Sequence, residues 1–302
     1  MEGTGMESSV RLEAEIGRRF SPEIAWPTIL LTLGLLAVLA ISSAFAVAGD
    51  LPILAAAAIN AVALYAIYTP LHDASHSAIV PRRKGLRWIN TAIGIVAAFP
   101  IFMFHFHHRK SHFVHHARTN MPEDPDTFAI GSFAKVFFVK TPWSMINYLN
   151  GVALYRECIR YKLPRRDRIL TMAQYFLVVA LMVAAVLAGY GYELLMLWIL
   201  PWFVGVLLMQ VAFGWFPHHD HGETGRYRDT RIALFPGGDL LFLYQNLHLV
   251  HHMLPVVPFY RYRAVFDALR PTLEQHGARI EGFWPYSPAT SSVATTGVAN
   301  RA

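Results

Sequence analysis

The stretch HFVHH at residues 112–116 holds three histidines at a spacing that one face of a helix can present together. Two other stretches have similar spacings: HDASH at residues 72–76 holds two histidines, and HLVHH at residues 248–252 holds three. Three groups of this kind can converge on metal, and chance seldom produces all three in one chain. The eight predicted ligands are His72, His76, His112, His115, His116, His248, His251 and His252.

The type of ligand limits which metals can bind. The only cysteine is Cys158, so the groups offer imidazole without thiolate, which suits iron, copper, zinc or nickel. One mononuclear site cannot use eight imidazoles. The count therefore predicts two metal ions that share them.

The composition indicates that the metal site lies at a membrane. Apolar residues make up 54% of the chain and charged residues 15%, and the mean hydropathy is +0.34. Uncharged runs at residues 24–49, 51–69, 169–192 and 194–217 are long enough to cross a bilayer. Short turns join them in pairs. We therefore expect an all-α integral membrane protein with four transmembrane helices in two hairpins, and a cytoplasmic helical cap that holds the histidines.

The basic residues predict the orientation. Of 26 Lys and Arg, three precede the first run, fifteen lie between the hairpins and eight follow the last run. The positive-inside rule then places both termini and all three histidine groups in the cytoplasm, so the protein is expected to be a multi-pass protein of a bacterial inner membrane. Contact with anionic headgroups explains the excess of positive charge, and nucleic-acid binding is not expected.

The predicted organisation has three parts. Residues 1–23 form a cytoplasmic N-terminal segment, residues 24–282 form the membrane domain, and residues 283–302 are small and polar and are expected to be disordered. Within the membrane domain, residues 89–104 are slightly short for a span, and they are interpreted as a segment that enters and leaves on the cytoplasmic side. Residues 133–154 are amphipathic and are expected to lie in the membrane interface.

The histidine groups and their flanks resemble a known superfamily. HDASH, HFVHH followed by ARTNMPEDPD, and QNLHLVHHMLPVVPFYRY at residues 245–262 are similar to the membrane fatty acid desaturases and hydroxylases. The likeness runs from about Trp26 to Arg263. HDASH, PHHDHGETGRYRDTR at residues 217–231 and the third group are most similar to the β-carotene hydroxylase branch.

This resemblance implies a non-haem di-iron centre that uses O2 and two external electrons to attack an unactivated C–H bond. The eight histidines named above match the ligand positions of the superfamily. Members usually add a ninth nitrogen or a held water at the end of the fourth span; His218 occupies the matching place, and His221 is the alternative.

Imidazole ligands need partners that orient their second nitrogen, and the sequence offers several candidates. Asp73 and Asp126 are the carboxylates favoured for this role, although either could instead cap a helix or pair with an arginine. His108 lies four residues before His112 and is expected near the same face, as a polar neighbour of the metal or at the mouth of the substrate site.

The expected reaction is hydroxylation of a carotenoid ring, and the alternative is desaturation, hydroxylation or decarboxylation of a fatty acyl chain. Phe99, Phe102, Phe104 and Trp215 are expected to line the substrate tunnel. Because the sequence contains no ferredoxin-like cysteine motif, the chain is not expected to supply its own electrons. The expected partners are a ferredoxin-type electron donor and its reductase. A membrane metal-ion transporter is the competing interpretation from another class; it would need ionisable groups inside the spans, where only Asp50 and Glu193 lie at the outer turns.

Overall fold

The computed structural model describes residues 2–219 and 222–284. The predicted disordered tail at residues 283–302 and the alternative ligand His221 therefore lie, apart from residues 283 and 284, outside the described residues.

Four helical stretches among the described residues are long and apolar enough to cross a membrane, as the sequence predicted. The first is α2 (Trp26–Ala48), and the third is α10 (Arg165–Leu187). The second, Ile53–Ser75, consists of α3 (Ile53–Ala66) and α4 (Tyr68–Ser75) and continues six residues past the predicted end at 69, so it carries His72. The fourth, Gly191–His218, consists of α11 (Gly191–Leu194), η5 (Leu195–Ile199), α12 (Leu200–Met209), η6 (Gln210–Trp215) and α13 (Phe216–His218).

Prolines explain the irregular turns of the fourth stretch. The segments η5 and η6 are π-helical, and each ends two residues before a proline, Pro201 or Pro217. A proline lacks the N–H of the regular ladder, and its ring crowds the preceding turn, which a wider turn relieves. The second of these wide turns directly precedes His218.

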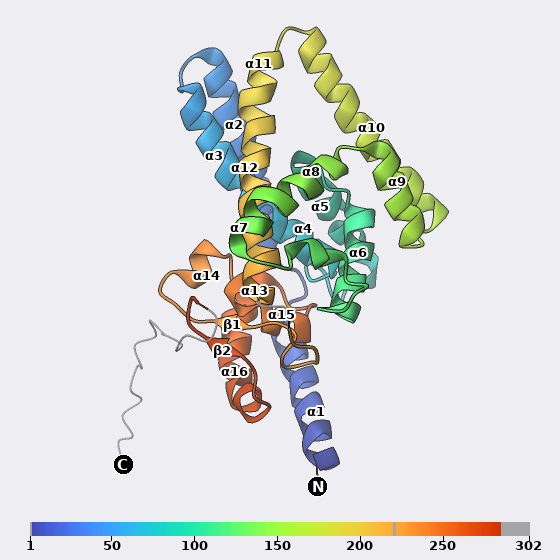
Figure 1. The fold of residues 1–302 in the computed structure, drawn as a ribbon, viewed down its shortest axis with the longest axis vertical. Helices are drawn as coiled ribbons and strands as arrows, with labels where there is room; N and C mark the ends of the chain where they lie inside the picture. The colour runs from blue at the N-terminus through green and yellow to red at the C-terminus, as the bar shows by residue number, and fades with distance from the viewer. Residues whose placement is uncertain (1, 220–221, 285–302) are drawn as a thin grey trace.

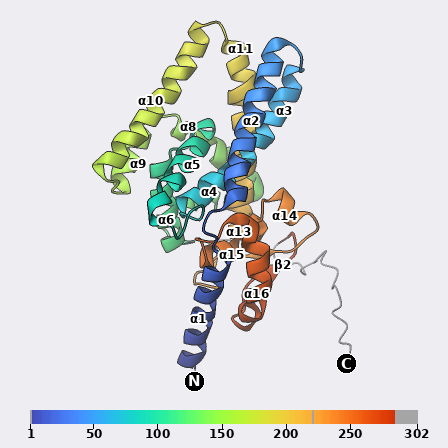
Figure 2. The same ribbon diagram turned by 180° about the vertical axis from the view of Figure 1, so that it is seen from behind.

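The spans do not all pack equally closely against one another. A Cβ atom at Gly205 of α12 would lie 2.6 Å from the carbonyl oxygen of Ala61 on α3, so only glycine allows these two helices to approach so closely. Figures 1 and 2 show α2, α3 and α12 side by side, whereas α10 leans away from α12 after the turn that joins it to α11. The fourth span therefore packs closely along the second span, and its contacts with the third span are fewer.

Shorter helices and one small sheet connect and cover the spans. The chain bends by 97° between Lys84–Ile101 and His105–Arg118, where Phe102 adopts a positive φ of 52°. The helices and strands outside the four spans are α1 (Glu2–Phe20), η1 (Lys84–Leu86), α5 (Trp88–Ala98), η2 (Phe99–Ile101), α6 (His105–Arg118), η3 (Pro125–Ala129), α7 (Phe133–Lys135), η4 (Val136–Lys140), α8 (Thr141–Tyr148), α9 (Gly151–Arg160), β1 (Ile232–Ala233), α14 (Gly238–Leu241), η7 (Gln245–Leu247), α15 (His248–Met253), η8 (Phe259–Arg261), α16 (Tyr262–Gln275) and β2 (Ile280–Glu281).

The C-terminal part of the domain is tied to the end of the fourth span. Strands β1 and β2 pair in parallel, and the fully buried Arg231 directly precedes β1. Its guanidinium donates to the carbonyl oxygen of Phe216 and forms an ion pair with Glu281 on β2. These bonds satisfy a buried charge and fix α13, which carries His218.

Candidate metal centre

Four helices bring nine histidines together. Helix α4 supplies His72, and His76 follows its last residue directly; α6 supplies one predicted group, α15 supplies another, and α13 supplies His218. Within each of two groups of four, one ring nitrogen per histidine lies within 4.8 Å of the others. The first group is His72, His76, His112 and His251; the second is His115, His218, His248 and His252.

The remaining predicted ligand, His116, lies between the two groups. Its Nε2 atom is 2.9 Å from Nε2 of His251 and 3.2 Å from Nε2 of His112. Two nitrogens bound to one metal at about 2.0–2.1 Å, at tetrahedral or right angles, would be about 2.8–3.4 Å apart. The spacing of these imidazoles therefore fits shared coordination.

Burial and the lack of other partners also fit metal binding. The Nε2 atoms of His72, His76 and His252 are buried and have no hydrogen-bond partner among the described residues. Leaving such a group unpaired is costly, so a ligand for these nitrogens is expected. Burial, together with the neighbouring imidazoles, also lowers the pKa of His112, His248 and His251 well below 6.5. These rings are therefore neutral and can donate a lone pair.

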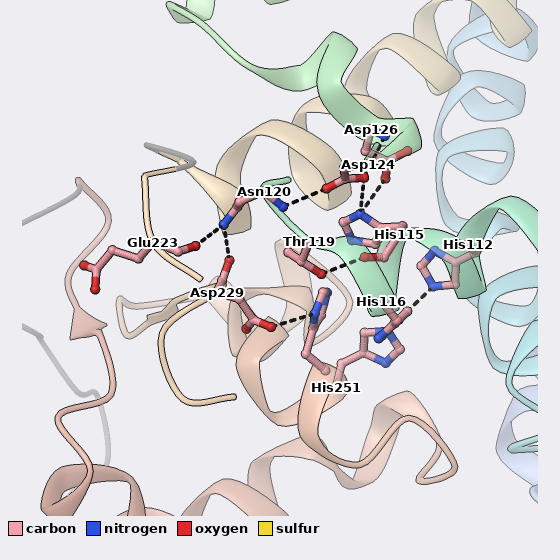
Figure 3. Close-up of polar contacts among 11 residues, drawn as sticks. His112, His115, His116, Thr119, Asn120, Asp124, Asp126, Glu223, Asp229 and His251 are labelled. Atoms are coloured by element: carbon pink, nitrogen blue, oxygen red, sulfur yellow. Dashed lines mark hydrogen bonds and ion pairs between the residues drawn. The ribbon is translucent and has the colours of Figure 1, made fainter. Parts of the chain in front are cut away.

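His115 differs from the other rings because two carboxylates lie beside it. Its Nδ1 atom is 2.8 Å from Oδ1 of Asp124 and 3.6 Å from Oδ2 of Asp126 (Figure 3). Burial alone would lower the pKa of His115, but the charges of Asp126 and Asp124 and the hydrogen bond outweigh it and raise the pKa. A carboxylate on Nδ1 fixes the ring so that Nε2 can point to a metal.

Two further histidines, His248 and His251, also have a hydrogen-bond partner at Nδ1, in each case from a residue near the third group. Nδ1 of His248 is 2.7 Å from the side-chain oxygen of Gln245, and Nδ1 of His251 is 3.0 Å from the hydroxyl of Tyr262. Sequence reasoning did not select Gln245 or Tyr262. The position of Gln245, three residues before His248, was the available signal, whereas Tyr262 is eleven residues beyond His251.

The loop that directly follows α6 connects the centre to the segment that follows α13. The backbone N–H of Asn120 donates to Asp124, and its side-chain amide donates to the carbonyl oxygens of Glu223 and Asp229 (Figure 3). Asp229 in turn places a carboxylate oxygen 3.8 Å from Nδ1 of His252. One loop thus supports ligands from two different helices.

The other predicted neighbours have distinct places. Asp73 accepts hydrogen bonds from the Thr28 hydroxyl at 2.8 Å and from the Phe259 backbone N–H at 3.2 Å, so its bonds join α2 to the segment after α15. His108 stacks on His112 with ring centroids 5.4 Å apart and belongs to neither group of four.

Three cavities that share the lining residue Tyr148 lie at or near the centre. A cavity of about 40 Å³ touches His72, His112, His115 and His248. A vestibule of about 440 Å³ has polar lining from Asp126, Asn147 and Glu157, and an apolar cavity of about 230 Å³ is lined by residues of α10 and by Phe102 and Phe104. Tyr148 lines all three.

Two of the four predicted tunnel aromatics, Phe102 and Phe104, therefore line the apolar cavity, which shares Tyr148 with the cavity at the histidines. Phe99 instead stacks on Trp198 with centroids 6.0 Å apart. Trp215 packs against Phe133, and its indole N–H donates to the Gly131 carbonyl oxygen at 2.9 Å.

Comparison with known proteins agrees with this geometry. The sequence model of the family described as fatty acid desaturase matches residues 50–284, which include all three histidine groups and His218. No curated protein sequence matches the chain. Members of the matched family are oxygen-dependent oxidoreductases. Because the match covers most of the chain and all nine histidines, this membrane protein belongs to the fatty acid desaturase family.

Proposed function

We propose that the chain oxidises a C–H bond of a membrane lipid at two iron ions held by the nine histidines. The observation that carries this proposal is the pair of four-histidine groups, with His116 between them. Bound iron would supply the activation of O2 that organic side chains cannot perform. The first group would hold one ion and the second group the other.

The protein's own residues would orient the imidazole ligands, keep most of them uncharged and shield the centre from water. Asp124, Gln245 and Tyr262 each occupy the Nδ1 atom of one ligand, which leaves the opposite nitrogen for the metal. Burial keeps most of the imidazoles uncharged, so protonation does not compete with metal binding. The cavity beside them is small, about 40 Å³, and would leave little room for water next to the reacting carbon.

A lipid could reach this centre from the bilayer. The apolar cavity lies against Val178 and Met182 of the third span and shares Tyr148 with the cavity beside the histidines. An apolar chain would enter there, while a polar end would suit the vestibule with Asn147 and Glu157.

The leading candidate substrate is a carotenoid whose ring is hydroxylated, on the similarity of HDASH and of residues 217–231 and 245–262 to β-carotene hydroxylases. A fatty acyl chain is the second candidate. Two observations favour it: the description of the matched family, and a cavity of about 40 Å³, which suits a methylene segment better than a substituted ring.

We further propose that the centre faces the cytoplasm of a bacterial inner membrane and takes electrons from a ferredoxin-type donor with its reductase. Support comes from the distribution of all 26 basic residues outside the two short turns. The meeting of His72 and His112 in one cluster also supports it, because a full crossing by α5 would separate them.

The proposal is tested on metal and on product. Purified protein should contain about two irons per chain, and His252→Ala should lower that number and abolish turnover. Expression in a host that makes β-carotene, with carotenoids and fatty acids analysed by mass spectrometry in parallel, separates the substrates. A single metal, or zinc alone in active protein, would contradict the di-iron centre. Unchanged carotenoids beside altered acyl chains would reject the carotenoid and leave the centre intact.

A further inference from the structure

A fourth cavity reaches the histidines at a different place. It has a volume of about 520 Å³ and touches His76, the last residue of the first histidine group. None of its lining residues lines the three cavities that share Tyr148. The metal centre thus has two separate approaches.

The two approaches differ in charge. Arg87 and Arg109 line the cavity at His76, and its lining includes no carboxylate. The vestibule on the other approach is lined by Asp126 and Glu157 and by no lysine or arginine. An acidic protein surface would therefore be attracted to the first approach and repelled by the second.

The basic character extends beyond the lining. Arg82, Lys84 and Lys110 are exposed neighbours in sequence of the two lining arginines, and Arg83 is paired with Glu23. Neither Arg87 nor Arg109 forms an ion pair among the residues that the structure describes, and Nε of Arg109 is buried without a hydrogen-bond partner. These guanidinium groups can therefore donate hydrogen bonds to carboxylates from outside the chain.

We infer that the cavity lined by Arg87, Arg109 and His76 is the docking site of an acidic one-electron carrier of the ferredoxin type. This inference rests on the proposed di-iron function. In hydroxylation, one O2, two electrons and two protons convert a C–H group to C–OH and one water, so two reduced carriers are each oxidised by one electron per turnover. A carrier at this site would be separated from the metal-binding nitrogens by the imidazole of His76, while the lipid occupies the other approach.

The test measures binding and not only activity. An acidic [2Fe–2S] ferredoxin is titrated against iron-loaded full-length protein in phosphatidylcholine nanodiscs, and Kd is measured across a range of salt concentrations. Arg87→Glu and Arg109→Gln should each raise Kd at least about fivefold and flatten its dependence on salt. Arg109→Lys keeps the charge and should remain within about threefold of the wild type.

Arg166→Glu is the matched control, because Arg166 is exposed, lies at the start of α10 and lines none of the four cavities. It makes the same change of charge and should alter Kd less than about twofold. Equal losses in Arg87→Glu and Arg166→Glu would show attraction by net charge alone and would overturn the assigned site.

Anionic lipid is the other possible occupant of a basic cavity. If Arg87→Glu leaves ferredoxin binding unchanged but loses bound phosphatidylglycerol in native mass spectrometry, the site binds a headgroup and the inference is wrong. Iron content is measured on the same samples. A chain without iron contradicts the proposed function, whereas an iron-loaded chain that binds ferredoxin equally well without Arg87 contradicts only the docking site.

Discussion

The Nδ1 atom of His115 lies 2.8 Å from Oδ1 of Asp124, and the two side chains are 2% and 5% exposed. The same carboxylate accepts the backbone N–H groups of Asn120 and Asp126. Asp124 therefore orients a metal ligand while its own position is fixed by the backbone around it. A buried carboxylate held in this way is part of the structure that pre-organises the centre.

Asp124→Asn should weaken iron binding at the second group of histidines. The substitution keeps the shape of the side chain but removes the negative charge beside His115, and loss of such a partner lowers metal affinity or activity by about 10- to 100-fold. Iron retained during dialysis against a graded chelator measures the effect. Glu123→Gln removes a neighbouring exposed charge and serves as the control. Equal iron retention in the two variants would show that Asp124 only shapes the loop.

The sequence predicted which histidines lie together because their spacing is local. Histidines three or four positions apart place their imidazoles on one helical face, and long uncharged runs indicate spans directly. The carboxylate at Asp124 was harder to select. Asp124 and Asp126 are both near α6 in sequence, and only the turn at Pro125 decides which of them reaches His115 more closely.

Features that depend on contacts between distant segments could not be predicted in this way. The packing of α12 on α3 depends on a close approach of Gly205 to Ala61, which lies 144 positions earlier in the chain (205 − 61). Tyr262 supports His251 only because α16 folds back on α15. The π-helical turns did have a local signal, since prolines at 201 and 217 interrupt an apolar run.

Metal-free protein should lose stability as the pH falls below about 6.5. Burial lowers the pKa of His112, His248, His251 and His252 in the folded chain, so below 6.5 the unfolded chain binds more protons. The stabilisation is complete above 6.5 and is lost progressively below it, by up to about 1.4 kcal/mol per pH unit for each group. Unfolding of chelator-treated protein in detergent between pH 7.5 and 5.5 measures this. His252→Gln should reduce the slope; a flat profile in the wild type would contradict the neutral cluster.

Gly205→Ala should destabilise the membrane domain. The added methyl group would meet the backbone of α3 at Ala61, which cannot move as a side chain can, and overpacking of this kind costs about 1–3 kcal/mol. Gly34→Ala on α2 is the matched control, because nothing lies within 4 Å of its new methyl group. Thermal unfolding in one detergent should separate the two variants by several degrees. Equal melting temperatures would show that α3 and α12 can separate without cost.

Cysteine labelling should place the turn after α2 and the loop after α6 on opposite sides of the membrane. A cysteine at Asp50 should react with a membrane-impermeant maleimide in intact bacteria with a permeable outer membrane, and one at Glu123 only after the inner membrane is opened. The native Cys158 is buried and gives the background. Labelling at position 123 in intact cells would contradict a cytoplasmic centre.

Tyr148→Ala should change which carbon of the lipid is oxidised. Tyr148 lines the cavity beside the histidines, the polar vestibule and the apolar cavity, so its ring limits how a chain passes between them. Removal of the ring lets the chain settle at other depths, and misplacement by about 1 Å can lower the rate about 100-fold. We expect a mixture of products and a fall in kcat/KM of about 10- to 100-fold.

Tyr148→Phe keeps the ring and removes only the hydroxyl, so it should retain the wild-type product. Mass spectrometry of derivatised lipids measures the position of oxidation. An unchanged product from Tyr148→Ala, at an unchanged iron content, would show that the lipid takes a path that Tyr148 does not border.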